Sequence, residues 1–302
     1  MIAINEKIRL AKPFLKWAGG KTQLLSEIEN RLPKGFSAGQ FTTYIEPFVG
    51  GGAAFFYIAQ NYPEIKKFYL YDINSDLVNC YNAVKSDVRS LIKTLDKIES
   101  KFLPLNQEAR KKFYLDIRKN FNHEKINDGG VEVAAKLIFL NKTCFNGLYR
   151  VNSKDEFNVP FGDYKNPKIC DKKNLLAASK VLQKTEILCG DFTKSRKHIN
   201  KKTFVYLDPP YRPLNATASF TSYSKDSFSE HDQIRLADFC REIEKKEAKF
   251  LLSNSDPKNE NEKDHFFEDN FGEFSICRVK ASRMINCKAY GRGQIDELLI
   301  IN

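Results

Sequence analysis

The chain has 302 residues, of which 42% are hydrophobic and 29% are charged, and its 49 basic residues outnumber its 38 acidic ones to give a net charge of +11. This size and composition indicate one large α/β domain, alone or with a smaller inserted domain, and exclude disorder on a large scale. The positive charge favours a polyanionic partner, although a lysine-rich composition can equally reflect an AT-rich genome.

The N-terminal residues and the cysteines argue against export and against a metal site. Residues 1–14 lack a continuous apolar stretch, and no run of 18 apolar residues occurs in the sequence, so we expect neither a signal peptide nor a membrane span. The seven cysteines form no CxxC pair and no spacing with histidine that suits zinc. We therefore expect reduced thiols and a cytoplasmic protein without a bound metal.

Short runs of β-branched and aromatic residues predict parallel strands, each ending near an acidic or amide side chain. In chain order these runs are Thr42–Ile45, Phe68–Tyr71, Glu186–Cys189, Phe204–Leu207 and Phe250–Ser253. Helical periodicity between several of them predicts an α/β fold with a doubly wound sheet that binds ligands at the carboxyl ends of its strands. The last two runs, Phe274–Val279 and Glu297–Ile301, have too little chain between them for a clear helix and could form a terminal hairpin.

The stretch between the second and third predicted strands is too long for a single crossover. More than a hundred residues separate Asp72 from Glu186, and apolar side chains recur among them at helical spacing. A loop-like segment rich in Asn, Gly and Pro then follows. We therefore predict a helical subdomain over residues 75–168, inserted into a catalytic domain formed by residues 1–74 and 169–302.

Acidic residues and glycines at the strand ends predict a nucleotide-like ligand. The sequence EPFVGGG at 46–52 lets the backbone approach a ligand closely and places the Glu46 carboxylate beside it, although a plain tight turn would look the same. Asp72 ends the second strand, where an acidic side chain typically accepts hydrogen bonds from ribose hydroxyls. Asp191 and Phe192, after the third strand, offer a carboxylate for an adenine amino group and an aromatic face for its ring. The GxGxxG spacing of dinucleotide sites is absent.

The sequence Asp208-Pro209-Pro210-Tyr211 after the fourth strand carries the strongest chemical signal. Methylation of an amino group on a base requires a nitrogen lone pair that is normally delocalised into the ring, so a site must hold both N–H groups. The Asp208 carboxylate can accept one N–H and the Pro209 carbonyl the other, in a loop that the two prolines make rigid. Tyr211 offers a flat face for a base extruded from a duplex. A structural Pro-Pro turn is the alternative.

Five segments in this order resemble the Dam-like, alpha-group N6-adenine DNA methyltransferases. They are KWAGGK at 16–21, EPFVGGGA at 46–53, YDIN at 71–74, CGDF at 189–192 and DPPY at 208–211. The resemblance implies a Rossmann-like methyltransferase sheet with an inserted DNA-recognition subdomain. It implies an enzyme that transfers a methyl group from S-adenosylmethionine to a flipped adenine in double-stranded DNA.

The stretches FNGLYRVNSKDEFNVPFG at 145–162 and DPPYRPLNATASFTSY at 208–223 are especially similar to GATC-modifying methylases of type II restriction systems. This similarity implies GATC as the target, and either a cognate restriction endonuclease that acts separately or an orphan methylase. Asp163 departs from the family, which carries arginine at this position, and so removes an expected phosphate contact.

The resemblance also assigns roles residue by residue. It implies contacts with S-adenosylmethionine for Trp17, Lys21, Glu46, Phe48, Gly50, Asp72, Asp191, Phe192 and Asp208. It implies contacts with DNA for Lys16, Phe145, Asn146, Leu148 and Arg150. Phe145 and Asn146 would hold the gap left by the flipped adenine, and Lys16 and Arg150 would read guanines. A phosphate contact for Arg150 and a core position for Phe145 are the alternatives.

Two further expectations and two rival functions complete the interpretation. The loop Arg212–Ser229 could close over the flipped base, and we expect a monomer. One rival is methylation of another planar amine, such as cytosine N4, an RNA amine or a protein glutamine; Asp208 favours adenine, because the resemblance associates Ser or Asn with the other amines. The second rival is a non-catalytic DNA-binding protein that keeps the fold as a ligand sensor, against which the intact Asp208 argues.

Overall fold

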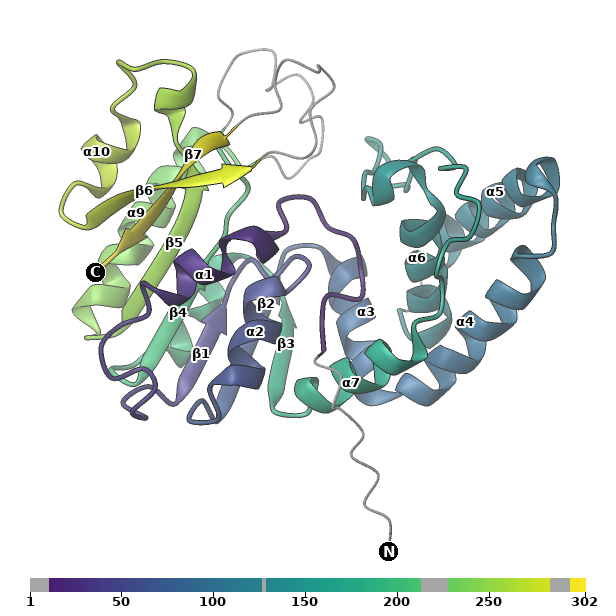
Figure 1. The fold of residues 1–302 in the computed structure, drawn as a ribbon, viewed down its shortest axis with the longest axis horizontal. Helices are drawn as coiled ribbons and strands as arrows, with labels where there is room; N and C mark the ends of the chain where they lie inside the picture. The colour runs from purple at the N-terminus through teal and green to yellow at the C-terminus, as the bar shows by residue number, and fades with distance from the viewer. Residues whose placement is uncertain (1–10, 127–128, 213–227, 283–293) are drawn as a thin grey trace, which may run out of the picture.

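A computed structural model describes residues 11–126, 129–212, 228–282 and 294–302, which form a twisted sheet with helices on both faces and a helical lobe beside it (Figure 1). The strands are β1 (Thr43–Glu46), β2 (Lys67–Asp72), β3 (Thr185–Cys189), β4 (Thr203–Leu207), β5 (Lys249–Ser255), β6 (Ser275–Ser282) and β7 (Gln294–Ile301). They lie in the order β3-β2-β1-β4-β5-β7-β6. The first five are parallel, and β7 is antiparallel to both of its neighbours. The predicted α/β sheet is confirmed, and the last two runs do form a hairpin.

The direction in which the sheet grows reverses between β1 and β4. The chain adds β2 and β3 on one side of β1 and then returns to place β4 and β5 on the other side. Such a reversal leaves a crevice at the carboxyl ends of the two central strands, because the connections on either side turn away from each other. Glu46 ends β1 and Asp208 directly follows β4, so both residues stand at the carboxyl ends of the two strands between which the order reverses.

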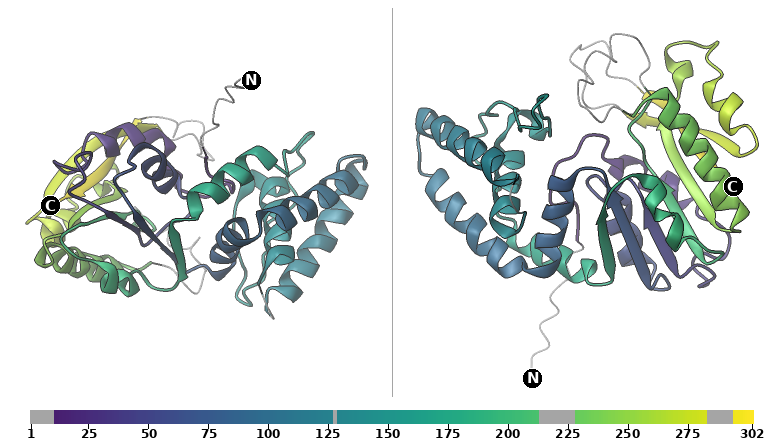
Figure 2. Two further views of the ribbon diagram at one scale, coloured as in Figure 1. Left: turned by 90° about the horizontal axis from the view of Figure 1, so that it is seen from below. Right: turned by 180° about the vertical axis from the view of Figure 1, so that it is seen from behind.

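Alternate residues of the central strands pack on opposite faces of the sheet. In β4, Phe204 and Tyr206 belong to one buried cluster, whereas Val205 and Leu207 belong to the other. The first face is covered by the short turn η1 (Lys21–Leu24) and by α1 (Leu25–Glu29), α2 (Ala53–Asn61), α3 (Ser75–Ser86) and α7 (Lys172–Leu182). The second face is covered by η3 (Phe192–His198), α9 (Glu230–Lys245) and α10 (Phe266–Phe271), and η4 (Pro257–Asn259) follows β5 (Figure 2).

The lobe consists of α4 (Val88–Phe102), α5 (Gln107–Glu124), α6 (Val131–Thr143) and the turn η2 (Phe145–Gly147). Asp87 and Asn106 cap the first two helices by accepting hydrogen bonds from the backbone N–H groups of Ser90 and Ala109. α6 is the central helix, since it packs on α3, α4 and α5. The region predicted to be helical is therefore helical, and the Asn-rich segment after it is a loop.

The lobe and the sheet share a single core. The buried aromatic side chains of the lobe belong to the same continuous cluster as the side chains on the first face of the sheet. α3 makes this connection, because it packs on β3 at one side and on α6 at the other. The predicted boundary at residue 75 thus coincides with the start of a helix that serves both parts.

Two expectations from the sequence concern membrane spans and the loop after the fourth strand. No helix among the described residues has both the length and the apolar character needed to cross a bilayer. The loop Arg212–Ser229, which we expected to close over a base, lies outside the described residues apart from its two ends.

Candidate active site

The carboxyl edge of the sheet gathers four acidic residues. Glu46, Asp72 and Asp208 stand at or directly after the ends of β1, β2 and β4, and Asp191 follows β3 by two residues. Because all four strands are parallel, their carboxyl ends meet at one edge. The sequence-predicted acids are therefore brought to the same side of the molecule.

Asp208 is held by two donors on one of its two oxygens. The Lys21 ammonium lies 2.8 Å from Oδ1, and the Ser253 hydroxyl donates to the same oxygen at 2.9 Å. Lys21 also donates to the Gly19 carbonyl at 2.7 Å. Burial raises the pKa of Asp208, and the Lys21 ammonium and the Ser253 hydroxyl oppose that rise. Within the described part of the chain no group donates to Oδ2, and 19% of the side chain stays exposed.

The rest of the predicted catalytic loop, residues 208–212, is tied to the strands and helix beneath it. The buried Gln233 amide donates to the Pro210 carbonyl at 3.0 Å, and Asn254 accepts a bond from the Arg212 N–H at 3.3 Å. The Tyr211 hydroxyl donates to Glu297 on β7 at 2.7 Å. These contacts come from α9, β5 and β7, so three separate elements fix the loop.

Lys21 also lies against the ring of Tyr211. Its ammonium is 4.5 Å from the ring centroid, while the lysine side chain is only 6% exposed. Burial raises the pKa of the Tyr211 phenol, and the nearby Asp208 and Glu297 carboxylates add to the rise. Tyr211 is therefore a neutral aromatic ring with a cation beside it.

Glu46 is covered rather than open. Its side chain is 2% exposed and accepts a hydrogen bond from the Tyr44 hydroxyl at 2.6 Å. Burial raises the pKa of Glu46 well above its usual range; the Tyr44 bond opposes this rise and the Asp208 carboxylate adds to it. Burial and the nearby Asp208 carboxylate thus both oppose ionisation of Glu46.

Trp17 packs on the glycine turn after β1. Gly50 has a φ of +47°, and a Cβ at this position would lie 2.9 Å from Trp17 Cδ1, so only glycine allows this approach. The Gly50 N–H donates to one oxygen of Asp72 at 3.0 Å, and the Asn74 N–H donates to the other at 2.9 Å. Burial raises the pKa of Asp72, and these backbone bonds oppose the rise.

Asp191 and Phe192 are engaged differently from each other. Asp191 is partly exposed and accepts hydrogen bonds from Arg235 at 3.2 Å. Phe192 is 2% exposed and packs against the half-buried Phe48, with 5.4 Å between the ring centroids. Of these two rings, Phe48 is the one that offers accessible surface at the strand ends.

The segment expected to meet DNA projects from the lobe. Phe145 is 52% exposed and Leu148 is 37% exposed, so two large apolar side chains three positions apart face solvent on this segment. Asn146 between them has a φ of +55°, a conformation in which asparagine is enriched. The Arg150 guanidinium is exposed and is oriented by Asn158, whose side-chain oxygen accepts a bond from Nε at 2.7 Å. The alternative of a core position for Phe145 is excluded by its exposure.

Asn141 joins this segment to the N-terminal one, a contact that the sequence analysis missed. Its buried side chain accepts from the Lys16 N–H and donates to the Lys16 carbonyl, both at 2.8 Å, and it donates to the Gly147 carbonyl at 3.0 Å. Trp17 stacks on Tyr149, with 5.2 Å between the ring centroids. The only signal in the sequence was an amide within the apolar run LIFLNKT.

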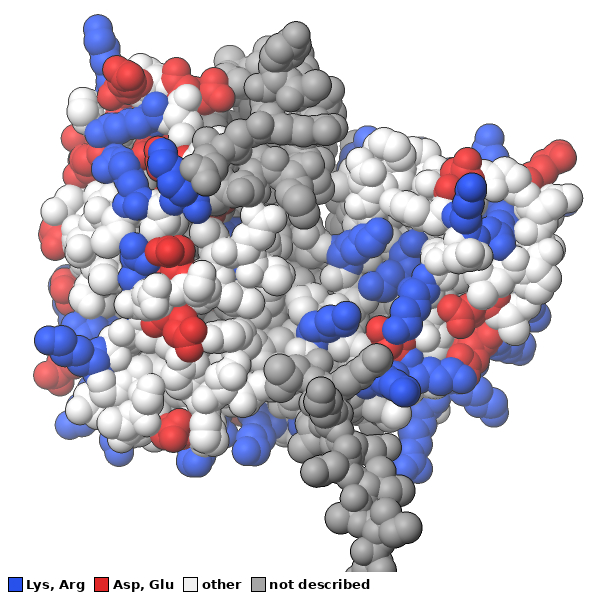
Figure 3. Space-filling model, in the orientation of Figure 1, with Lys and Arg blue, Asp and Glu red and all other residues white. Residues whose placement is uncertain are grey.

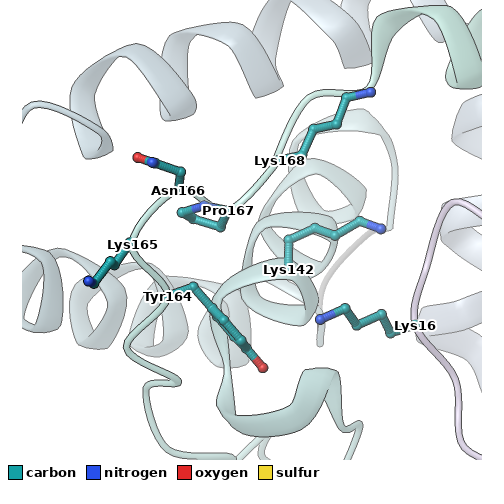
Figure 4. A pocket seen from close by; sticks show the side chains of 7 residues that line it. All are labelled: Lys16, Lys142, Tyr164, Lys165, Asn166, Pro167 and Lys168. Carbon is teal, nitrogen blue, oxygen red and sulfur yellow. The ribbon is translucent and has the colours of Figure 1, made fainter.

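A basic pocket of about 330 Å³ opens beside Lys16 (Figure 4). Its walls are formed by Lys16, Lys142, Tyr164, Lys165, Asn166, Pro167 and Lys168. Burial and the neighbouring lysines together lower the pKa of Lys142 to about 8. Basic residues also gather on the surface between the sheet and the lobe (Figure 3). In the part of the chain that the structure describes, no three His, Cys, Asp or Glu side chains are placed to hold a metal.

Comparison with known proteins identifies the family of the chain. Residues 17–285 match the model of the D12 class N6 adenine-specific DNA methyltransferases. A type II methyltransferase, M.MjaIII of Methanocaldococcus jannaschii, is 53% identical over 96% of this chain and 99% of its own length. The chain belongs to the D12 class of N6-adenine-specific DNA methyltransferases.

Other relatives of this D12 methyltransferase extend over nearly the whole chain. The type II methyltransferase M1.LlaDCHI of Lactococcus lactis is 39% identical over 99% of this chain and 97% of its own. A DNA adenine methylase of Vibrio cholerae is 35% identical over 96% and 95% of the two chains. The predicted family and the predicted enzyme class are confirmed, which removes the rival interpretation of a non-catalytic ligand sensor.

Proposed function

We propose that this D12 methyltransferase transfers a methyl group from S-adenosylmethionine to the N6 amine of an adenine flipped out of duplex DNA, within the sequence GATC. The observation that carries the proposal is the state of Asp208: both of its donors bind Oδ1, and Oδ2 has no donor among the described residues. A carboxylate oxygen in this state is an acceptor for one N–H of the amine. The Pro209 carbonyl, in a loop fixed from below, is the proposed acceptor for the other.

The chemistry of the strand ends suits S-adenosylmethionine. This compound supplies an electrophilic methyl group on a sulfonium, together with an ammonium group, ribose hydroxyls and an adenine amine. Its cations and donors match the carboxylates of Asp72, Asp191 and Asp208, all at one edge of the sheet. Gly50 lets the Trp17 ring pack directly on the turn after β1, because a Cβ there would lie 2.9 Å from Trp17 Cδ1. The half-buried Phe48 offers an aromatic surface for an adenine ring.

The residues of the catalytic loop would act by holding the amine. Asp208 and Pro209 draw its two N–H groups out of the plane of the ring, so the lone pair is freed to form the new N–C bond while the C–S bond breaks and its electron pair stays on sulfur. One proton then leaves the nitrogen for solvent. Tyr211 would supply a face against which the flipped base rests. Because the loop is already fixed, little reorganisation accompanies the reaction.

The exposed segment and the basic pocket support DNA as the substrate. The duplex backbone would follow the lysines around the pocket, where phosphates gain attraction independent of sequence. Phe145 and Asn146 would enter the space left by the adenine, beside Leu148, and Lys16 and Arg150 would read base edges. The target GATC rests on the resemblance of residues 145–162 and 208–223, and a separate restriction endonuclease rests on the type II names of relatives.

The proposal is tested with purified protein, tritiated S-adenosylmethionine and short duplexes. We expect label in a GATC duplex, recovered as N6-methyladenine after digestion to nucleosides, and much less label when any one base of the site is changed. Asp208→Ala should abolish transfer while DNA affinity stays within about threefold, because the loop contributes to chemistry rather than to binding. Label found in cytosine, or normal turnover in Asp208→Ala, would contradict the proposal.

A further inference from the structure

A buried pair of hydroxyl groups lies beneath the predicted catalytic loop, on the neighbouring strands β4 and β5. Ser253 on β5 is fully buried, and its hydroxyl lies 3.2 Å from the Tyr206 hydroxyl on β4 and 2.9 Å from Asp208 Oδ1. Tyr206 is 1% exposed. Burying two hydroxyl groups costs free energy unless each is hydrogen-bonded, and here each bonds the other on the path to the carboxylate.

The geometry gives this pair a direction. The Asp208 carboxylate cannot donate when ionised, so Ser253 must be the donor to Oδ1. Its one proton then goes to Asp208 at 2.9 Å rather than to the more distant Leu207 carbonyl at 3.5 Å, and Tyr206 is the donor to Ser253. The chain of donors therefore runs from Tyr206 through Ser253 to Asp208, and it ends on the oxygen that Lys21 also binds.

Two donors on one oxygen fix the rotation of a carboxylate. Lys21 approaches from η1 and Ser253 from β5, so the group is held from two elements. With Lys21 alone, the flexible side chain of the lysine would let the carboxylate turn. Ser253 stands on a central strand with no rotatable bond beyond χ1 other than its hydroxyl. It is the more rigid of the two supports.

We propose that Ser253 is a positioning residue for methyl transfer, which keeps Oδ2 of Asp208 directed at the target amine, with Tyr206 supporting it. The inference rests on the proposed function and deepens it. Ser253 is fully buried, so its loss should slow the methyl-transfer step without weakening the binding of either substrate. The Ser253 hydroxyl also lowers the pKa of Asp208, and removing it should move the acid limb of the pH profile to higher pH.

Other titratable and charged groups near Asp208 also influence the acid limb of the pH profile. They are Lys21 from η1, Tyr44 and Glu46 from β1, Tyr206 from β4, Tyr211 from the loop and Glu297 from β7. All of them are retained when only Ser253 is changed. A shift between wild type and a Ser253 variant therefore reports the hydroxyl and not these neighbours.

The test compares Ser253→Ala with Ser255→Ala. Ser255 is on the same strand and is also buried, but its hydroxyl donates to the Arg212 carbonyl at 3.4 Å and not to Asp208, so it controls for a buried hydroxyl that meets the end of the loop without meeting the carboxylate. We expect the single-turnover rate of Ser253→Ala to fall about 10- to 100-fold, the range associated with a hydrogen bond to a charged group, with KM for both substrates within about threefold. Ser255→Ala should stay within about twofold of wild type. The ¹³C resonance of the Asp208 carboxyl, followed against pH, should titrate at higher pH in Ser253→Ala alone.

Three results would overturn the inference. They are a rate for Ser253→Ala within threefold of wild type at every pH, an equal loss in Ser255→Ala, and an unmoved carboxyl titration. If Ser253→Ala does not fold, Ser253→Cys and Tyr206→Phe take its place, with a smaller slowing and the same upward shift expected from both. A wild type that methylates no adenine defeats the proposed function instead, whereas an active wild type beside an unaffected Ser253 variant defeats only this inference.

Discussion

The catalytic loop and the segment around η2 are built in opposite ways. The loop at 208–212 is bonded from below by Ser253, Gln233 and Asn254, which are fully buried. The segment at 145–150 is held to its neighbours by Asn141, which bonds the Gly147 carbonyl, and by Tyr149, which donates to Asp76, but it presents Phe145 and Leu148 to solvent. Rigid support suits a carboxylate that must meet a reacting amine at one angle. Exposure suits side chains that contact a macromolecule only when it binds.

This difference predicts that substitutions in the two regions fail in different ways. Changes beneath the catalytic loop should alter stability and the rate of the chemical step together, because the same buried bonds serve both. Changes on the exposed segment should alter the choice of DNA site and leave the fold intact.

The largest effect on stability is expected for Lys21→Met. This substitution leaves the buried Asp208 carboxylate without its cation, which should cost about 3–5 kcal/mol in the free energy of unfolding at pH 8. The loss should shrink as pH falls. Without Lys21, the pKa of Asp208 in the folded state rises further above its value in the unfolded chain, so protonation of Asp208 stabilises the folded variant. This stabilisation is fully present below the unfolded pKa and is lost as pH rises through the folded pKa. Urea unfolding at several pH values measures this, and Lys16→Met is the exposed control. An equal loss in both variants would remove the contrast between the two regions.

A smaller loss of stability is expected for Asn141→Ala. It leaves the Lys16 N–H and two carbonyl groups without their partner, which should cost about 1–3 kcal/mol. It should also blur the choice between GATC and single-base variants, because Lys16 is no longer held against Gly147. Urea unfolding and kcat/KM on each duplex test both effects, with the exposed Asn61→Ala as control. Unfolding without any change in site preference would show that Asn141 only supports the fold.

Arg150→Ala should leave stability within about 0.5 kcal/mol, because the side chain is exposed. It should reduce discrimination at one guanine by about 1–3 kcal/mol, as expected for a guanidinium that pairs with a base edge. Competition between duplexes with single-base changes measures the difference. Affinity lost equally for all sequences would instead indicate a phosphate contact.

The smallest effect is expected for the pH dependence of DNA binding. Lys142 has a pKa near 8, so it is charged at pH 7 and largely neutral at pH 9. The Kd for DNA should therefore rise over this interval, and the rise should be weaker in Lys142→Arg, which keeps its charge. Binding titrations at constant ionic strength test this. A Kd that does not depend on pH in wild type would show that Lys142 lies away from the phosphates.

The elements of this fold were predictable where the signal is local. Runs of β-branched residues and their spacing located all five parallel strands and the terminal hairpin, and the strand ends located the acidic edge. The supports of the site were not predictable. Ser253 meets Asp208 only because β5 lies beside β4, and Asn141 meets Lys16 across 125 positions of sequence. Phe192 shows the same limit, since its burial depends on how α9 and Phe48 pack around it.

The core shared by the lobe and the sheet constrains how such enzymes can be recombined. A graft that moved only α4, α5 and α6 between two relatives would cut through the contacts that α6 makes with α3. A transplant that carried α3 and α7 as well would keep those contacts, but it would cut the contacts that both helices make with β3. Substitution of exposed residues within 145–168 should therefore change the preferred DNA site with less damage to the fold than exchange of the whole lobe.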